Sequence, residues 1–322
     1  MRNANDKKVV LVTAVGGDIG YSYAKSIANE EFRLIGCDMS TLPGGQSPFE
    51  QVCQVPPANQ PGGYLQAIKE ICQDRDVDLI VPISEPEIKA FHEHRKEWLS
   101  WKTKVLINND LILNNFLDKY KTIRFLESIG IRTPKTYLLK DYQGQLDYPM
   151  IGKRRNGCGS KNIWKIETDL DLEYLKRKDD GMYLIQEYLG SDGQEYTTGV
   201  FSDGDHVSSI TFKRRLGLGG LSVEVDLADA PEIDQMAAKL AGATELIGSI
   251  NIQSRFCDGE YIPFEINPRF SSTLSFRKQF GFADCLWWPR VCLGGTYVYK
   301  RQFKSGHGAR FLTESYSAMD RI

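Results

Sequence analysis

Residues 248–270 (GSINIQSRFCDGEYIPFEINPRF) concentrate side chains that can bind hard metal ions. The pattern is typical of a β-hairpin with an Asp-Gly turn. Because side chains alternate along a strand, Glu265 and Asn267 face the same side, while Gln253 lies on the partner strand. Carboxylate and amide oxygens are ligands that suit Mg²⁺, and substrate phosphates complete its shell. The alternative is a polar hairpin face that is exposed to solvent.

The register of this hairpin decides whether the polar groups meet. A two-residue turn sets Ile252 opposite Glu265 and mixes polar with apolar side chains on each face. A three-residue loop (258–260), or an equivalent bulge, sets Gln253 opposite Glu265 and unites the apolar side chains. Because burial favours that register, we predict a cluster of Gln253, Glu265 and Asn267. The buried reverse face should contain Ile250, Ile252, Phe256, Ile262, Phe264 and Ile266.

Two further stretches have residue types that suit a nucleotide. In the first, a strand ends at Lys153 and a loop with Gly157, Gly159 and Ser160 follows. Small residues let backbone N–H groups approach phosphate oxygens, and a Lys adds a mobile positive charge. An ordinary Gly-rich hairpin loop is the alternative.

The second stretch, 183–200, contains a strand, a turn and the start of another strand at Glu195. Free backbone groups at a strand edge can bind adenine, and a carboxylate such as Glu195 can accept hydrogen bonds from ribose hydroxyls. An acidic residue beside a hairpin turn is the alternative. The candidate adenine-binding residues are Gln186, Glu187, Tyr188 and Leu189.

The elements that position these residues fall into two groups. The first third of the chain alternates strands (8–14, 33–37, 77–83, 104–107) with helices (through 28, and 87–98). This order predicts an α/β region with a parallel sheet. A helix over 118–128 follows. From residue 148 onward, strands with Gly-containing turns and helices near 170–177 and 231–247 predict an α+β region.

The opening strand leads into glycines that resemble a dinucleotide-binding loop only in part. Gly16, Gly17 and Gly20 are spaced G-G-x-x-G rather than G-x-G-x-x-G, and Asp38 ends the second strand. We interpret the glycines as a tight strand-to-helix turn. A dinucleotide-dependent oxidoreductase stays open as an alternative, although it leaves the Gln, Glu and Asn cluster unexplained.

Composition narrows the class of protein. The net charge of −2 gives no sign of a nucleic-acid-binding surface. The seven Cys residues include no C-x-x-C pair, so we expect reduced thiols in a cytoplasmic protein rather than disulfides or structural zinc. No apolar run reaches membrane-spanning length, and the polar start of the chain does not suit a secretory signal.

Taken in order, these motifs resemble the ATP-grasp superfamily over nearly the whole chain. They are D-K at 118–119, G-I-x-x-P at 130–134, Lys153 with its Gly loop, Q-E-Y at 186–188, E-Y at 195–196, Gln253, and E-I-N-P-R at 265–269. The chain is similar to stand-alone relatives of the synthetase unit of the carbamoyl phosphate synthetase large chain. It is also similar to the pyrrolysine-pathway ligase.

This resemblance implies a domain order. A pre-ATP-grasp parallel-sheet domain is expected over 1–110, and a two-lobed ATP-grasp domain follows. Its N-lobe is expected over 111–185 and its C-lobe, with the metal site, over 186–300. A tail is expected over 301–322.

The resemblance also implies roles for individual residues. Lys119 and Lys153 would contact ATP phosphates under the cover of Gly157, Gly159 and Ser160. Residues Gln186 to Leu189 would hold adenine, and Glu195 would hold ribose. Gln253, Glu265 and Asn267 would bind two Mg²⁺ (or Mn²⁺) ions, with Glu265 bridging them. Arg269 would stabilise an acyl phosphate, and Lys213 or Arg214 would reach the γ-phosphate. Lys161 departs from the small residue that many relatives have in the loop.

Substrate contacts are expected at Ser84, Glu85, Ser271, Ser272 and Arg277. Glu85 could hold a substrate amine, or it could be an acid that the helix dipole favours. The implied activity joins a small-molecule carboxylate to an amine through an acyl phosphate, with release of ADP and phosphate. A carbamoyl-phosphate-synthase-like kinase acting on bicarbonate or carbamate, and a non-catalytic ATP-binding module, remain alternatives. A homodimer remains open.

Overall fold

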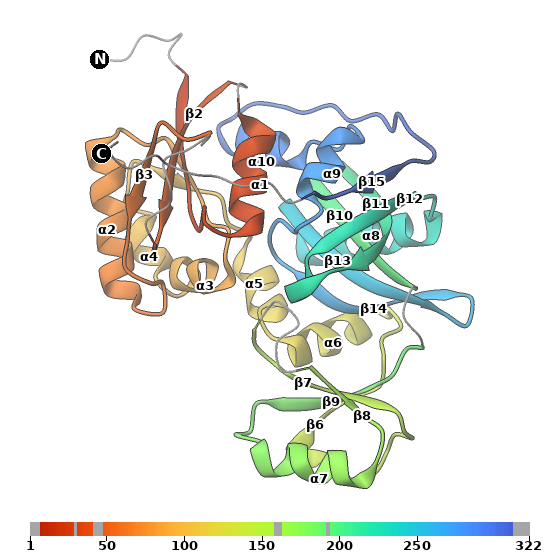
Figure 1. Ribbon diagram of the computed structural model, residues 1–322. Coiled ribbons are helices and arrows are strands. Elements are labelled where there is room, and N and C mark those ends of the chain that lie inside the picture. The colour runs from red at the N-terminus through yellow and green to blue at the C-terminus, as the bar shows by residue number, and fades with distance from the viewer. Residues whose placement is uncertain (1–6, 29–30, 41–47, 158–162, 191–193, 312–322) are drawn as a thin grey trace, which may run out of the picture. The chain divides into compact units, whose positions relative to one another are not determined.

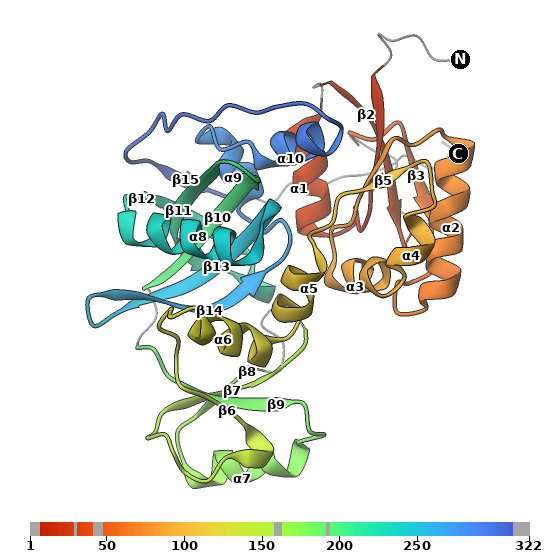
Figure 2. The same ribbon diagram turned by 180° about the vertical axis from the view of Figure 1, so that it is seen from behind.

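The computed structural model describes residues 7–28, 31–40, 48–157, 163–190 and 194–311 (Figures 1 and 2). The predicted loop residues Gly159 and Ser160 lie outside the described residues. The chain forms two compact units. The first contains Met1–Ile107, Arg269–Arg301 and Arg310–Ile322, and the second contains Asn108–Pro268 and Gln302–Ala309.

A five-stranded sheet forms the centre of the first unit, in the order β3-β2-β1-β4-β5. All of its neighbouring strands are parallel. The predicted α/β fold is therefore confirmed, as expected for continuous apolar runs buried on both faces. The strands are β1 (Lys8–Val12), β2 (Phe32–Asp38), β3 (Gln51–Gln54), β4 (Leu79–Val81) and β5 (Lys104–Val105).

Helices cover both faces of this sheet. One face carries α1 (Asp18–Ile27), against which α9 (Leu274–Gln279) and α10 (Asp284–Cys292) pack. The other face forms a core with α2 (Pro61–Asp74), α3 (Glu85–Glu93) and α4 (Arg95–Trp98). Sequence patterns did not predict β3, α2, α9 or α10.

The glycines after β1 serve the turn into α1. The Asp38 carboxylate accepts hydrogen bonds from the Gly16 N–H (2.8 Å) and from the N–H and hydroxyl of Ser40 (3.0 and 2.8 Å). Hydrogen bonds within the protein therefore occupy this carboxylate, which a dinucleotide-binding site would use to bind a ribose. A Cβ atom on Gly20 would lie 2.3 Å from the carbonyl oxygen of Ala14, so the turn needs glycine there.

We expect Gly20→Ala to lower the free energy of unfolding by about 1–3 kcal/mol, because the added methyl group collides with backbone rather than with a movable side chain. Denaturant unfolding measures the change. Gly62→Ala is the matched control, because a Cβ on this helical glycine meets nothing within 4 Å. An equal loss in both variants would contradict the close approach at Gly20.

The second unit contains two sheets. The larger is a six-stranded antiparallel sheet in the order β14-β13-β10-β11-β12-β15. One of its faces packs on α5 (Asp110–Phe116), α6 (Lys119–Ser128) and α8 (Pro231–Thr244) through a hydrophobic core. The strands are β10 (Glu195–Asp203), β11 (Val207–Leu216), β12 (Ser222–Ala228), β13 (Ile247–Cys257), β14 (Glu260–Asn267) and β15 (His307–Ala309).

The smaller sheet has four strands in the order β6-β9-β7-β8, and α7 (Asp169–Lys178) covers one face (Figure 1). The strands are β6 (Thr136–Leu138), β7 (Met150–Arg154), β8 (Ile163–Ile166) and β9 (Tyr183–Glu187). Short 3₁₀ turns occur at Leu139–Asp141 and Leu218–Gly220. No helix within the described ranges has both the length and the apolar character that a membrane crossing requires.

The packing units differ from the expected domain boundaries near the C-terminus. Residues 269–301 pack with the first unit because α9 and α10 contact α1. Residues 302–309 belong to the second unit because β15 pairs with the edge strand β12. Both are contacts between segments far apart in the sequence, which the local pattern does not encode.

Candidate active site

The β13–β14 hairpin brings the predicted polar residues together. Gln253 pairs with Glu265, and Asn251 pairs with Asn267, so the predicted register is confirmed. Of the two forms expected, a three-residue loop or a bulge, the structure has the bulge, because Cys257 pairs with Glu260 across a two-residue turn. A bulge beside Gln253 shifts the register by one residue instead, and unites the faces in the way that a longer loop would.

The apolar reverse face is confirmed in part. Ile250, Ile252, Ile262 and Ile266 are at most 1% exposed. Phe256, near the hairpin tip, is 36% exposed. Phe264 is half-buried, because it is the extra residue of the bulge, between Pro263 and Glu265, which both have partners on β13. Its ring centroid lies 5.4 Å from Lys153 Nζ.

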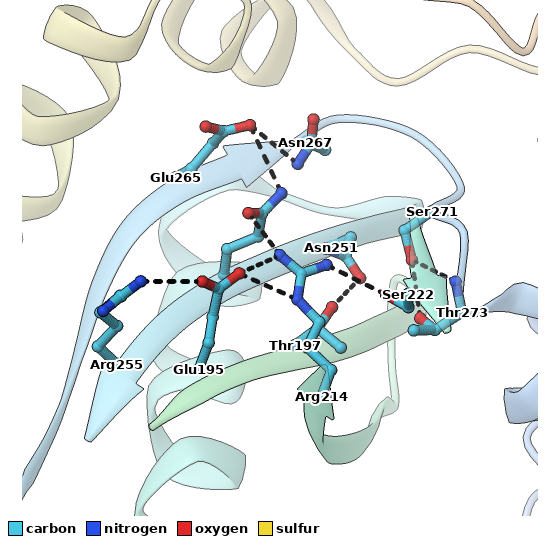
Figure 3. A network of polar contacts seen from close by, with 11 residues as sticks. Glu195, Thr197, Arg214, Ser222, Asn251, Arg255, Glu265, Asn267, Ser271 and Thr273 are labelled. Atoms are coloured by element: carbon cyan, nitrogen blue, oxygen red, sulfur yellow. Dashed lines mark hydrogen bonds and ion pairs between the residues drawn. The ribbon is translucent and has the colours of Figure 1, made fainter. Parts of the chain in front are cut away.

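Glu265 is the centre of the polar cluster. Its Oε1 accepts hydrogen bonds from Gln253 Nε2 at 3.5 Å and from Asn267 Nδ2 at 3.4 Å (Figure 3). Its Oε2 lies 3.9 Å from Lys119 Nζ. Within the described ranges, no group of three or more His, Cys, Asp and Glu side chains is arranged to hold a metal ion by itself. One carboxylate with neighbouring amides suits an ion that shares its shell with substrate phosphates.

Lys153 reaches the same cluster from β7 of the smaller sheet. Its side chain is buried, with 4% of the residue exposed, and its Nζ lies 3.5 Å from the carbonyl oxygen of Phe264. Burial lowers the pKa of Lys153 to about 8, although the charge of Glu265 opposes the shift. Lys119 lowers this pKa further by repulsion. A buried, poorly compensated ammonium is the kind of group that an incoming anion stabilises.

Lys119 is the first residue of α6 and is held beside the Gly loop. Its Nζ donates a hydrogen bond to the carbonyl oxygen of Gly157 at 2.6 Å. Asp118 caps the helix, accepting from the Tyr120 N–H at 2.9 Å, and binds Arg155 Nη2 at 2.6 Å. Arg155 therefore joins the start of α6 to the end of β7. Sequence patterns gave no signal for this contact, because the two residues belong to different elements.

Arg214 and Arg255 hold Glu195, the expected ribose-binding residue. Arg214 donates to Glu195 Oε1 from Nε (3.1 Å) and Nη2 (2.6 Å), and Arg255 Nη2 donates to Oε2 at 3.3 Å (Figure 3). Arg255 was not identified as a candidate site residue from the sequence. The period-two alternation that pairs Gln253 with Glu265 also places Arg255 on this face, and that signal would have found it.

The choice between Lys213 and Arg214 follows from the strand register. Tyr196 pairs with Lys213, so the side chain of Arg214 shares the face of Glu195, and Lys213 points to the opposite face. The opposite face is the one that α8 covers, where Ser209 Oγ donates to Asp234 Oδ1. The expected catalytic role of Lys213 is therefore wrong, because its strand position turns it away from the cluster.

The predicted adenine segment lies at the end of β9. The Gln186 side chain is buried and its Nε2 donates to Thr136 Oγ1 at 2.8 Å. Glu187 Oε2 accepts from the Lys135 N–H at 3.0 Å. These two side chains connect the end of β9 to the start of β6. Tyr188 and Leu189 follow the last residue of the strand.

Ser84 and Glu85 lie in the first unit, after β4. Ser84 is engaged by Glu87, whose Oε2 accepts from the Ser84 hydroxyl (2.7 Å) and N–H (2.9 Å). Burial raises the pKa of Glu87, and these hydrogen bonds oppose the shift. Glu85 begins α3, as the helix-start interpretation expects, and is half-buried. Glu87 thus orients the backbone that carries both candidates.

The remaining candidates also lie in the first unit. Arg269 is half-buried and its Nη1 donates to the Phe270 carbonyl at 2.9 Å. Ser271 and Ser272 are 5% and 8% exposed. The Arg277 and Asp284 side chains have no exposed surface and form an ion pair at 2.9 Å. The expected substrate contact by Arg277 is therefore wrong for this structure, because no ligand can reach its guanidinium.

Two family models match parts of this chain. The model of the PylC-like N-terminal domain matches residues 10–106, and the model of the ATP-grasp domain matches residues 116–273. A coenzyme gamma-F420-2:alpha-L-glutamate ligase from Methanococcus maripaludis is 30% identical over 172 residues. That match covers 48% of this chain and 59% of the relative, so the chain spans less than two thirds of that protein.

Two solved structures share the fold. N5-carboxyaminoimidazole synthetase from Staphylococcus aureus, complexed with ADP, has a TM-score of 0.76 at 15% identity, covering 96% of this chain and 84% of that one. The biotin carboxylase domain of 2-oxoglutarate carboxylase from Hydrogenobacter thermophilus, in complex with MgADP, ADP and bicarbonate, has a TM-score of 0.73 at 14% identity. It covers 92% of this chain and 71% of that one. Because the two family models together match residues 10–106 and 116–273, the chain belongs to the ATP-grasp superfamily.

Proposed function

We propose that the protein is an ATP-dependent carboxylate–amine ligase that forms an acyl phosphate and releases ADP and phosphate. The observation that carries this proposal is the convergence of Lys119, Lys153 and Glu265, from three different elements, on one partly buried polar face. Two ammonium groups and one carboxylate with flanking amides suit a triphosphate and its metal ion, because the lysines match the phosphate charge and the oxygens match the cation.

The polar cluster around Glu265, which includes Gln253 and Asn267, would form the Mg²⁺ site. Bound there, the ion would neutralise charge on the phosphate oxygens. Lys119 from α6 and Lys153 from β7 of the smaller sheet would add positive charge. Since phosphoryl transfer depends mainly on positioning and charge neutralisation, these groups supply what the step requires.

The proposed chemistry has two steps. A substrate carboxylate oxygen attacks the γ-phosphorus and the bond to the β–γ bridging oxygen breaks, which yields an acyl phosphate and ADP. An amine then attacks the acyl carbon, and phosphate leaves with the former carboxylate oxygen, while the amine loses a proton. Arg269 is the proposed contact for the acyl phosphate. Exclusion of water protects this intermediate from hydrolysis.

An amino acid is the proposed amine. The M. maripaludis relative is named as a ligase of alpha-L-glutamate, which supports an amine of that class. Ser84, Glu85, Ser271 and Ser272 remain the candidate substrate contacts, and the carboxylate of Glu85 is suited to an ammonium group.

The nucleotide preference gives a direct prediction. Mg·ATP or Mg·ADP should raise the melting temperature, because a ligand that binds only the native state stabilises it by about 2.7 kcal/mol at 100 times its Kd. NADH should produce no shift, since Asp38 is engaged by Gly16 and Ser40. Differential scanning fluorimetry measures both. A shift with NADH and none with Mg·ATP would support a dinucleotide enzyme instead.

Turnover tests the function itself. ADP release should be measured with pools of small carboxylates and amines, added separately and together. The ligase proposal predicts ADP release that needs both pools. Release with bicarbonate and no amine would identify a carbamoyl-phosphate-synthase-like kinase. Binding of Mg·ATP without turnover on any pool would identify a non-catalytic module.

A further inference from the structure

Arg214 cannot serve as a phosphate contact in the arrangement that the structure shows. Its side chain is 4% exposed. Two of its nitrogens donate to Glu195 Oε1, and Nη2 also donates to Gln253 Oε1 at 2.8 Å. Nη1 lies 3.5 Å from the hydroxyl of Ser222. A guanidinium that bridges a carboxylate and an amide is held in place by both.

Arg214 also fixes which way the Gln253 amide faces. A guanidinium can only donate hydrogen bonds, and an ionised carboxylate can only accept them. Gln253 therefore turns Oε1 toward Arg214 and Nε2 toward Glu265, at 2.8 and 3.5 Å. The reversed amide would place N–H groups against the guanidinium and a carbonyl against the carboxylate. The charges on either side therefore set this orientation.

Asn267 differs from Gln253 in this respect. Its Nδ2 also donates to Glu265, at 3.4 Å. Among the residues that the structure describes, however, no donor is bonded to Asn267 Oδ1. Its amide can reverse to offer oxygen to a metal ion at no cost in other hydrogen bonds, whereas reversal of Gln253 opposes Arg214. Both side chains end in an amide, but only the amide of Asn267 can reverse without opposing a neighbouring group.

We propose that Arg214 is a positioning residue that orients Glu195 for the nucleotide ribose and Gln253 for Glu265. Glu265 and Asn267 then supply the oxygens that face the metal ion, and Gln253 supports Glu265 as a hydrogen-bond donor. This inference rests on the proposed nucleotide site. Arg255 completes the arrangement from the other side, because it joins Glu195 to the carbonyl oxygen of Gly190 at 3.1 Å.

Affinities for adenine, adenosine and Mg·ADP separate a positioning role from a phosphate contact. In Arg214→Met, adenine should bind as in the wild type. Adenosine and Mg·ADP should both lose about tenfold in affinity, because both depend on an oriented Glu195. A loss for Mg·ADP alone would show a phosphate contact and overturn the proposal. A loss for all three ligands would show general damage and would also overturn it.

Two further variants make the test independent of folding. Arg214→Lys keeps the charge but is shorter and lacks the planar fork that holds both partners at fixed angles, so it should behave like Arg214→Met rather than like the wild type. Full recovery in Arg214→Lys would contradict the bridging role. Arg215→Met is the matched control, because Arg215 is the next residue on the strand and its exposed side chain pairs with Glu224. It should bind all three ligands normally.

Metal binding tests the second half of the proposal. With ADP present, Mn²⁺ affinity measured by electron paramagnetic resonance should fall at least about tenfold more in Asn267→Leu than in Gln253→Met. The reverse order would make Gln253 the metal ligand. If the wild-type protein binds neither adenosine nor Mg·ADP, the proposed function fails first, and that outcome is distinct from every result above.

Discussion

Glu265→Gln should leave a folded protein whose metal-dependent ADP release is reduced by at least about 100-fold, an effect typical of losing one preorganised charge in an active site. The substitution keeps the size and shape of the side chain. It removes the carboxylate that accepts hydrogen bonds from Gln253 and Asn267 and forms an ion pair with Lys119. Because Gln253 and Asn267 are neutral amides, neither of them replaces the lost charge.

Glu260→Gln is the matched control for this variant. It lies on the same strand, its side chain is 59% exposed, and its partner is the exposed Arg132. Turnover should be unchanged there, because an exposed ion pair contributes little. Turnover in Glu265→Gln near the wild-type level, with normal melting of both variants, would remove Glu265 from the mechanism.

Lys153→Met should stabilise the nucleotide-free protein while it abolishes nucleotide binding. The pKa of Lys153 is lowered from 10.5 to about 8 because its ammonium is buried. One pKa unit corresponds to 1.36 kcal/mol, so holding this charge inside the folded protein costs about 3 kcal/mol at pH 7. Methionine has a similar length and carries no charge, so the cost disappears.

The pH dependence identifies the cause. Below pH 8, Lys153 is protonated in the folded and the unfolded chain, so the full cost is present. Between about pH 8 and 10.5 the unfolded chain binds more protons, so the wild-type protein gains stability as the pH rises. The advantage of Lys153→Met in unfolding free energy should therefore shrink over this window and vanish above it.

Denaturant unfolding at pH 7 and at several higher values measures this difference, and Mg·ADP titration measures the binding loss. Lys165→Met is a control, because Lys165 lies on the neighbouring strand β8 with 48% of its side chain exposed. A destabilised Lys153→Met protein, or an advantage that does not change with pH, would contradict the buried-ammonium explanation. Unchanged Mg·ADP affinity would contradict the phosphate contact.

The hairpin shows what a sequence can predict about such a site. Strict alternation and the need to bury isoleucines sufficed to pair Gln253 with Glu265. They could not distinguish a longer turn from a bulge, because either device shifts the register by one residue. The choice between a turn and a bulge affects side-chain positions, because the bulge places Phe264 against Lys153 rather than in the core.

Contacts between elements were beyond the sequence. Lys213 and Arg214 are adjacent residues of the same charge, and only the pairing of β10 with β11 shows which of them faces Glu195. Arg155 reaches Asp118 from another element, and Arg277 is buried by its pairing with Asp284. Each of these outcomes depends on tertiary packing. The sequence shows which residue types are present, but it does not show which of them contact one another in the folded protein.

The transfer of oxygen from substrate to phosphate tests the central claim most directly. Once an active carboxylate is found, it should be labelled with ¹⁸O and incubated with the enzyme, Mg·ATP and the amine. The released phosphate is then examined by mass spectrometry. An acyl phosphate predicts one ¹⁸O atom in each phosphate, because the attacking carboxylate oxygen leaves with it. Phosphate without label, formed together with ADP and amide, would contradict the proposed mechanism.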